Sequence, residues 1–238
     1  MTLLFLFSVH ALLLQLDQKT IFYLREEIEM RLPDGVVEVK HRDIWIGLRR
    51  MRIDNVKDGT SMIYAQGINS MFLLDHRKRE YVFATSGSDR RVAQRPLFGL
   101  AALENGMLVK RGKFVTPLKE TRKIGDFNCR AFELNYPEDF GLTTKIYASE
   151  LPVFISPRTF LRIWYAAAGV NPPQDVRYIL GSLMRELKGV PIQIVSEIEQ
   201  EGFQIVTTST ITVIERRQDF EPQLFEIPKG YRRGDLAY

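Results

Sequence analysis

The sequence contains few of the residues from which catalytic and metal sites are commonly built. Among 238 residues it has one cysteine, Cys129, and three histidines, His10, His41 and His76. A single cysteine forms no disulfide within the chain, and no Cys-x-x-Cys or His-x-x-x-His spacing supports a metal site. The lack of a Gly-x-Gly-x-x-Gly or phosphate-binding glycine-lysine motif leaves nucleotide chemistry without support. We therefore predict a protein that is not an enzyme and has no metal or cofactor.

Charge of one sign is not in large excess. The 33 Lys and Arg residues against 29 Asp and Glu residues give a formal net charge of +4. Nucleic-acid binders usually add denser positive charge, aromatic stacking platforms or a recognisable motif, so we expect no nucleic-acid partner. Four basic clusters suit an anionic membrane surface or an acidic cell-envelope protein: Arg49-Arg50-Arg52, Arg77-Lys78-Arg79, Arg90-Arg91-Arg95 and Arg216-Arg217. Nothing in the sequence indicates an oligomeric state.

Long apolar runs are absent except at positions 1–20, where "MTLLFLFSVHALLLQL" is almost wholly apolar. This segment resembles the apolar region of an export signal, although no Lys or Arg precedes it and its one small-residue cleavage pattern, "VHA", lies early. A buried N-terminal helix and a membrane anchor are the alternatives; the anchor is less favoured because a span needs roughly 20 apolar residues. We expect a signal-peptide remnant, a periplasmic or otherwise exported protein, and a single domain at positions 21–238.

Alternation with a period of two dominates the rest of the chain. In "FYLREEIEMR" the residues Phe22, Leu24, Ile28 and Met30 fall on one face, which Glu26 interrupts. Turn residues separate such runs at intervals too short for helical crossovers, which predicts an antiparallel meander. The run "FQIVTTSTITVIERR" near the C-terminus is rich in β-branched residues and is the strongest strand signal.

Helical spacing is found in two segments. Residues 156–168 begin with a Ser-Pro capping pattern, and residues 174–188 carry an apolar stripe before Gly189. A third, short helix is expected before Leu103. A strongly twisted sheet must close or cover its apolar face, so we expect these helices to cover it. The predicted fold is mainly β: an incompletely closed antiparallel barrel, or strongly curved sheet, with two or three helices over its concave face.

Isolated reactive side chains have simple structural explanations. Cys129 lies in the alternating stretch "GDFNCRAFEL", without signs of the lowered thiol pKa and neighbouring base that catalysis requires. We expect a half-buried strand residue; intermolecular pairing and catalysis are less favoured. His41 is expected at an exposed strand position and His76 at a charged hairpin tip. Strand carboxylates such as Glu26 and Glu27 are expected on solvated faces, because Asp and Glu are mostly exposed.

Several motifs resemble a known family. They are "TRKIGDFNCRAFEL" followed by "KIYASELP", then "LKGVPIQI", and the closing "ITVIERRQDFEPQLFEIPKGY". Over positions 21–231 the chain is similar to bacterial periplasmic domains of unknown function related to the LolA/LolB-type lipoprotein-localisation carriers. The resemblance implies an unclosed antiparallel barrel whose concave face is covered by helices and holds acyl chains.

Our functional prediction is a non-catalytic exported domain that binds or carries an acyl chain or lipid. A cavity remains only if the cover packs imperfectly against the sheet, and a core packed without ligand is the alternative. In that case the chain is a cell-envelope interaction or scaffold module with a basic docking face. The residues expected to line the cavity are Trp45, Phe72, Phe160, Trp164, Val176, Ile179, Leu180 and Leu183.

Overall fold

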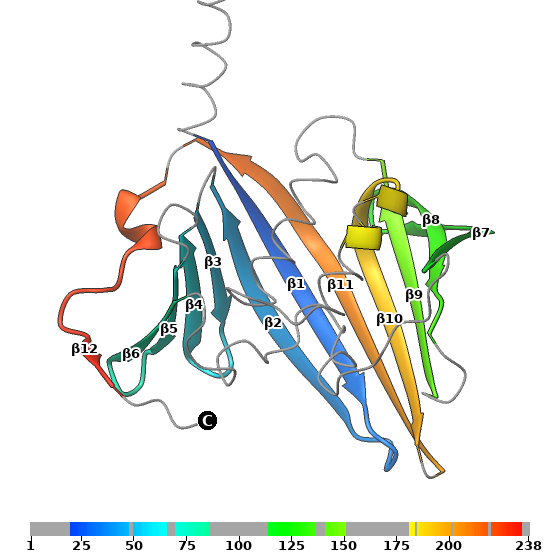
Figure 1. Ribbon diagram of the computed structural model, residues 1–238, viewed down its shortest axis with the longest axis horizontal. Coiled ribbons are helices and arrows are strands. Elements are labelled where there is room, and N and C mark those ends of the chain that lie inside the picture. Colours follow the sequence, from blue (N-terminus) through cyan, green and yellow to red (C-terminus); the bar gives the residue numbers. More distant parts are fainter. Residues whose placement is uncertain are drawn as a thin grey trace, which may run out of the picture.

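A computed structural model shows the chain as a broad, twisted β-sheet (Figure 1). It describes residues 20–47, 50–65, 70–85, 114–136, 141–150, 181–183, 185–200, 202–218 and 220–234. The expectations for positions 1–19 lie outside these residues. In the described part of the chain, no helix is long and apolar enough to cross a membrane.

Strands make up nearly all of the described structure. They are β1 (Ile21–Arg31), β2 (Val37–Ile46), β3 (Arg50–Asn55), β4 (Thr60–Ala65), β5 (Ser70–Asp75), β6 (Glu80–Thr85), β7 (Val115–Ile124), β8 (Phe127–Leu134), β9 (Leu142–Ser149), β10 (Val190–Gln200), β11 (Phe203–Arg217) and β12 (Arg232–Arg233). A 3-10 turn, η4 (Pro222–Phe225), precedes β12.

The strands form one sheet in the order β12-β6-β5-β4-β3-β2-β1-β11-β10-β9-β8-β7. Neighbours are antiparallel except β12 and β6, which are parallel, so the sheet is mixed. Strand direction changes progressively from β1 through β9 to β7 (Figure 1), as the right-handed twist of strands requires. Because β12 and β7 end the order without pairing to each other, the sheet is not closed. The prediction of a mainly β, unclosed fold is confirmed.

Hairpin turns follow the residues that the sequence offers. In the β1–β2 turn, Asp34 Oδ1 accepts a hydrogen bond from the Val36 N–H at 3.0 Å. Gly35 has φ 83°, a left-handed conformation that glycine adopts without steric penalty. The strongest strand signal becomes β11, which pairs with β1 and β10 at the centre of the sheet.

The two faces of the sheet differ in character. Residues paired across antiparallel strands share a face, and successive residues alternate. We call the face that contains Leu24 and Ile44 the core face, and the face that contains Tyr23 and Asp43 the polar face. Buried apolar side chains on the core face form one cluster: Leu24, Ile44, Ile46, Met51, Ile53, Phe132, Leu134, Ile146, Ile194 and Ile211.

The C-terminal tail, residues 220–234, covers part of the polar face beside β3. Phe225 of η4 is buried, and its ring lies beside Gly47 and Ile21, since a Cβ built on Gly47 would be 3.7 Å from both side chains. Arg52 Nη1 of β3 donates to the Leu224 carbonyl at 3.0 Å. The tail then reaches β6, where β12 pairs with it. Its attachment therefore combines apolar packing with backbone pairing.

The prediction of two or three helices is not borne out in the described residues. Residues 181–183 and 185–186 are helical, and the Leu187 N–H donates to the Leu183 carbonyl at 2.9 Å. Gly189 ends this segment with φ 102°, where an added Cβ would lie 2.6 Å from the Ser149 carbonyl oxygen. Residues 156–168, 174–180 and the short helix expected before Leu103 lie outside the described part.

Candidate functional site

Glu26 lies near the middle of β1 on the core face. It is in register with Arg42 of β2 on one side and Ile211 of β11 on the other. Its side chain is 0% exposed. A carboxyl buried at this depth loses its hydration, which is strongly unfavourable for the ionised form unless partners replace the water. The sequence prediction that Glu26 is solvated is therefore wrong.

The two oxygens of the Glu26 carboxyl differ in their partners. One oxygen, Oε1, accepts a hydrogen bond from the Ser209 hydroxyl of β11. The other, Oε2, lies 3.6 Å from Arg42 Nη1 and makes no hydrogen bond to any described residue. Arg42 Nε donates to Asn55 Oδ1 at 2.9 Å, which orients the guanidinium group toward β3. Glu26 therefore has one satisfied oxygen and one with only a long ion-pair contact.

Burial raises the pKa of Glu26 above its ordinary value, and it outweighs the charge of Arg42 and the hydrogen bond from Ser209, which act in the opposite direction. A raised pKa increases the share of neutral acid at a given pH. The neutral carboxyl can donate one hydrogen bond as well as accept, whereas the carboxylate can only accept. The group can therefore pair with a neutral polar group such as a hydroxyl in either protonation state.

The surroundings of Glu26 on the core face are mostly apolar. Two residues away along β1 lie Leu24 and Ile28, and Ile44 follows on β2; all three are buried. Low polarity around a charged or polar group strengthens its interactions with any partner that reaches it. With Arg42 and Ser209, Glu26 forms a small polar group on a face that is otherwise largely apolar.

The predicted lining residues divide between the two faces. Leu183 is 0% exposed and belongs to the core cluster. Trp45 is in register with Tyr23, and Phe72 with Ile63, so both lie on the polar face and not with the core cluster. Their role in ligand binding stays a prediction. The other predicted residues, at positions 160, 164, 176, 179 and 180, lie outside the described part of the chain.

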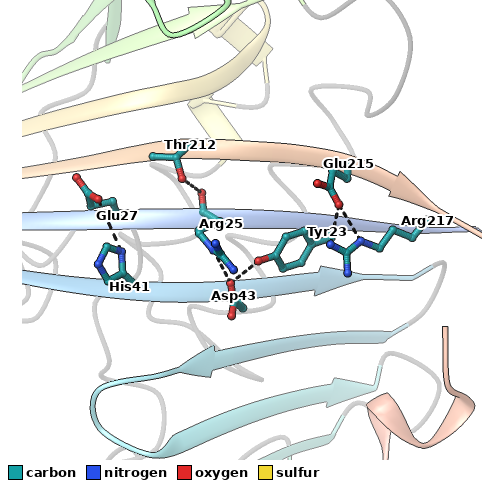
Figure 2. A network of polar contacts seen from close by, with 8 residues as sticks. All are labelled: Tyr23, Arg25, Glu27, His41, Asp43, Thr212, Glu215 and Arg217. Carbon is teal, nitrogen blue, oxygen red and sulfur yellow. Dashed lines mark hydrogen bonds and ion pairs between the residues drawn. The ribbon is translucent and has the colours of Figure 1, made fainter. Parts of the chain in front are cut away.

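The polar face over β1, β2 and β11 carries a network of ion pairs and hydrogen bonds (Figure 2). Asp43 accepts from the Tyr23 hydroxyl at 2.6 Å and from Arg25 Nε at 3.1 Å. The Arg217 guanidinium lies 4.1 Å from the Tyr23 ring centroid and 5.1 Å from that of Trp45, within cation–π range. The Tyr23 and Trp45 ring centroids are 4.5 Å apart, so the two rings and the Arg217 guanidinium pack together on this face.

Glu27 and His41 form a further pair in Figure 2, with Glu27 Oε2 3.8 Å from His41 Nδ1. Both side chains are about half exposed, 46% and 51%. The predictions that His41 occupies an exposed strand position and that Glu27 lies on a solvated face are confirmed. A surface pair of this kind adds little to stability.

His76 lies at the β5–β6 hairpin tip, as predicted, but it also attaches the tail. Its Nδ1 is 2.6 Å from the Tyr231 hydroxyl and its Nε2 is 2.5 Å from Ser61 Oγ. Ser61 in turn donates to Asp54. Burial, and then the charge of Arg52, lowers the pKa of His76. This favours the neutral ring, with Nε2–H donating to Ser61 and Nδ1 accepting from Tyr231.

The Ser61–His76 contact differs from a nucleophile–base arrangement. In a catalytic triad the acid orients the histidine, and the serine proton is directed at the ring nitrogen. Here Asp54 takes the Ser61 proton instead, and the second ring nitrogen faces Tyr231. The geometry supports attachment of the tail and gives no support to acyl transfer.

Cys129 is a buried residue of β8, 2% exposed. Burial raises its pKa to about 11, the opposite of what a reactive thiolate needs. The prediction of a strand residue is confirmed. Among the described residues, no group of three or more His, Cys, Asp or Glu side chains is placed to hold a metal ion.

Comparison with known proteins gives matches at the level of structure alone. No family model and no curated protein matches the sequence. An uncharacterised conserved protein from Thermus thermophilus has a TM-score of 0.47 at 10% identity, covering 95% of this chain and 98% of its own. A LolA superfamily protein from Nitrosomonas europaea has a TM-score of 0.38 at 11% identity, covering 91% and 96%.

The protein PNGF-II has a TM-score of 0.43 at 14% identity over 91% of this chain. The match covers only 31% of PNGF-II, so this chain corresponds to a part of that protein. The solved structures that match therefore include a protein of the LolA superfamily, the family that the sequence motifs resemble.

Proposed function

We propose that this chain binds an amphiphile with an acyl or alkyl chain along the core face of its open sheet. The observation that carries the proposal is the breadth of that face. Buried aliphatic side chains occupy it from β3 across β2, β1, β11, β10 and β9 to β8. An extended apolar chain gains free energy from each methylene it buries, about 0.8 kcal/mol per group. A wide apolar sheet face suits such a ligand better than a compact polar one.

The proposed function includes a cellular location. As a non-catalytic carrier of lipid or acyl chains, the protein acts in the periplasm or another exported location and meets anionic membrane surfaces. The sequence resemblance to periplasmic carriers supports this location. Leu183, buried in the core cluster, belongs to the ligand-facing set in this proposal, as do the predicted residues at positions 160, 164, 176, 179 and 180.

Mass spectrometry of organic extracts tests the proposal. The native protein is purified without detergent, and its extract is compared with that of a variant in which Ile146 and Ile194 are both replaced by asparagine. These residues are paired across β9 and β10 on the core face. A near-stoichiometric amphiphile in the native extract and its loss in the variant, with circular dichroism showing that the variant is folded, support the proposal. A lipid-free native extract, together with no uptake of added fatty alcohol, contradicts it.

A second candidate function, a basic docking face, is favoured by one observation. The Arg232 N–H donates to the Arg79 carbonyl at 3.1 Å, so the tail brings Arg232 and Arg233 beside the exposed β5–β6 turn. Arg77, Lys78, Arg232 and Arg233 are all exposed, and we propose that they act together as a basic patch. Glu80 offsets part of its charge through an ion pair with Arg232 at 2.8 Å.

Vesicle sedimentation tests this docking face. Vesicles of phosphatidylcholine with phosphatidylglycerol are compared with phosphatidylcholine alone, for the native chain and for the double variant Lys78→Glu with Arg233→Glu. Each removed charge near an anionic surface is worth roughly 1 kcal/mol, so we expect the variant to bind at least tenfold more weakly. The control is Lys119→Glu with Lys123→Glu on β7. Equal binding by the native chain and the patch variant counts against the docking face.

A further inference from the structure

We infer that Glu26 recognises the polar end of the ligand, by hydrogen bonding to an uncharged donor group such as a hydroxyl or an amide N–H. The inference rests on the proposed function, because it assigns a partner to a carboxyl on the core face where the apolar chain is proposed to lie. It adds the chemical class of the ligand: a single-chain amphiphile with a neutral hydrogen-bond donor near its head.

One oxygen of the Glu26 carboxyl lacks a hydrogen-bond partner in the described part of the chain. Glu26 Oε2 is buried and makes no hydrogen bond to any described residue. Buried polar side-chain atoms in folded proteins are nearly always paired, so an exception calls for a specific explanation. Oε1 is paired with Ser209, so a donor group that enters the core face would meet Oε2 as the oxygen without a hydrogen bond to a described residue.

The Arg42 guanidinium lies near this oxygen at more than hydrogen-bond length. Its Nη1 is 3.6 Å from Oε2, beyond ordinary hydrogen-bond length, while its Nε is bound to Asn55. The guanidinium therefore acts on Glu26 through its charge and through hydrogen bonding over a contact that is longer than an ordinary hydrogen bond. A buried pair with such geometry recovers only part of the desolvation penalty. A donor from a ligand would recover more of it.

The surroundings of Glu26 favour a ligand with a neutral donor group and an alkyl chain. While Glu26 is ionised, a ligand with its own carboxylate or phosphate close to it would bring two negative charges together in an apolar region, which is unfavourable. A hydroxyl or amide N–H has no such conflict and matches the acceptor. Because the neighbours Leu24, Ile28 and Ile44 are buried and apolar, they suit the alkyl part of the same molecule.

The same geometry should make the chain prefer ligands that carry a donor group over analogues that lack it. A ligand that lacks the donor leaves the buried Oε2 unpaired, and a site that hydrogen-bonds a ligand group rejects analogues without that group. We expect the native chain to bind 1-dodecanol about tenfold more tightly than its methyl ether, from one net hydrogen bond to a charged or partly charged acceptor.

Equilibrium dialysis with 1-dodecanol and its methyl ether tests the inference. The variant Glu26→Leu is expected to bind both ligands equally, with the ether bound about as well as by the native chain. The variant Glu26→Gln keeps the shape and an accepting oxygen, and is expected to retain part of the preference. Glu27→Leu, one residue along β1 on the polar face, is the matched control and should keep the native preference.

The outcomes separate the inference from the proposed function. If the native chain binds alcohol and ether equally, the inference is wrong while the proposed function stands. If it binds neither, both are overturned. Circular dichroism of each variant, and ether binding by Glu26→Leu, establish that the variants are folded. A preference that survives in Glu26→Leu contradicts the role of Glu26.

Discussion

Replacing Glu26 with glutamine should change the pH dependence of stability in a way that follows from its burial. The change removes one titrating group from the core face and keeps nearly the same shape. In the folded chain, burial raises the pKa of Glu26 above the ordinary value of 4.5. The native chain therefore holds a proton at pH values where the unfolded chain has lost it.

The direction in which the free energy of unfolding changes with pH follows from proton linkage. Stability falls with rising pH wherever the folded state binds more protons than the unfolded state. For Glu26 that window begins near pH 4.5 and extends to the higher folded pKa. A single proton limits the slope to about 1.4 kcal/mol per pH unit. Because glutamine does not titrate, the native free energy of unfolding minus that of Glu26→Gln should fall through this window and be level outside it.

Urea denaturation at half-unit steps from about pH 3.5 to 8 measures this difference. The control is Glu120→Gln on β7, since hydrogen bonding from Tyr147, followed by contact with Lys145, lowers the pKa of Glu120. Its stabilising effect is present above the ordinary pKa and is lost as the pH falls, so its difference curve should have the opposite slope. A level curve for Glu26→Gln, or a slope of the same sign as for Glu120→Gln, refutes the reasoning.

Three further predictions concern the tail and the cysteine. Tyr231→Phe removes the hydrogen bond to His76 and should lower the free energy of unfolding by about 1 kcal/mol in urea denaturation; an unchanged midpoint contradicts the attachment. The lowered pKa of His76 means that the native chain loses stability as the pH falls below 6.5. His76→Gln should lose this dependence, and parallel curves from about pH 7 to 5 count against it. Cys129, with its pKa raised to about 11, should react with a thiol reagent near neutral pH only after unfolding; rapid labelling of the native chain disproves its burial.

Alternation in the sequence predicted the strands because each has one apolar face. The phase of "FYLREEIEMR" places Glu26 with Leu24 and Ile28, and the same phase places it on the core face in the structure. Our prediction nevertheless placed Glu26 on a solvated face, because Asp and Glu are generally exposed. Trp45 directly follows Ile44 in "DIWIG", so alternation places its side chain on the other face of the sheet, the polar face.

Other features depend on contacts between distant residues. The partners of His76 are Ser61, 15 positions before it, and Tyr231, 155 positions after it. No local pattern marks these partners. The parallel pairing of β12 with β6 also depends on where the tail lies, and a two-residue strand has too little alternation to be recognised. The mixed character of the sheet was therefore beyond sequence patterning.

Photo-crosslinking tests most directly whether the core face holds the ligand. A fatty alcohol with a diazirine in its alkyl chain is bound to the native protein and irradiated, and the labelled peptides are mapped by mass spectrometry. The account predicts labels at core-face positions such as Ile44, Ile146 and Ile194. Labelling confined to the polar face around Tyr23 and Asp43, or no specific labelling at saturating ligand, contradicts it.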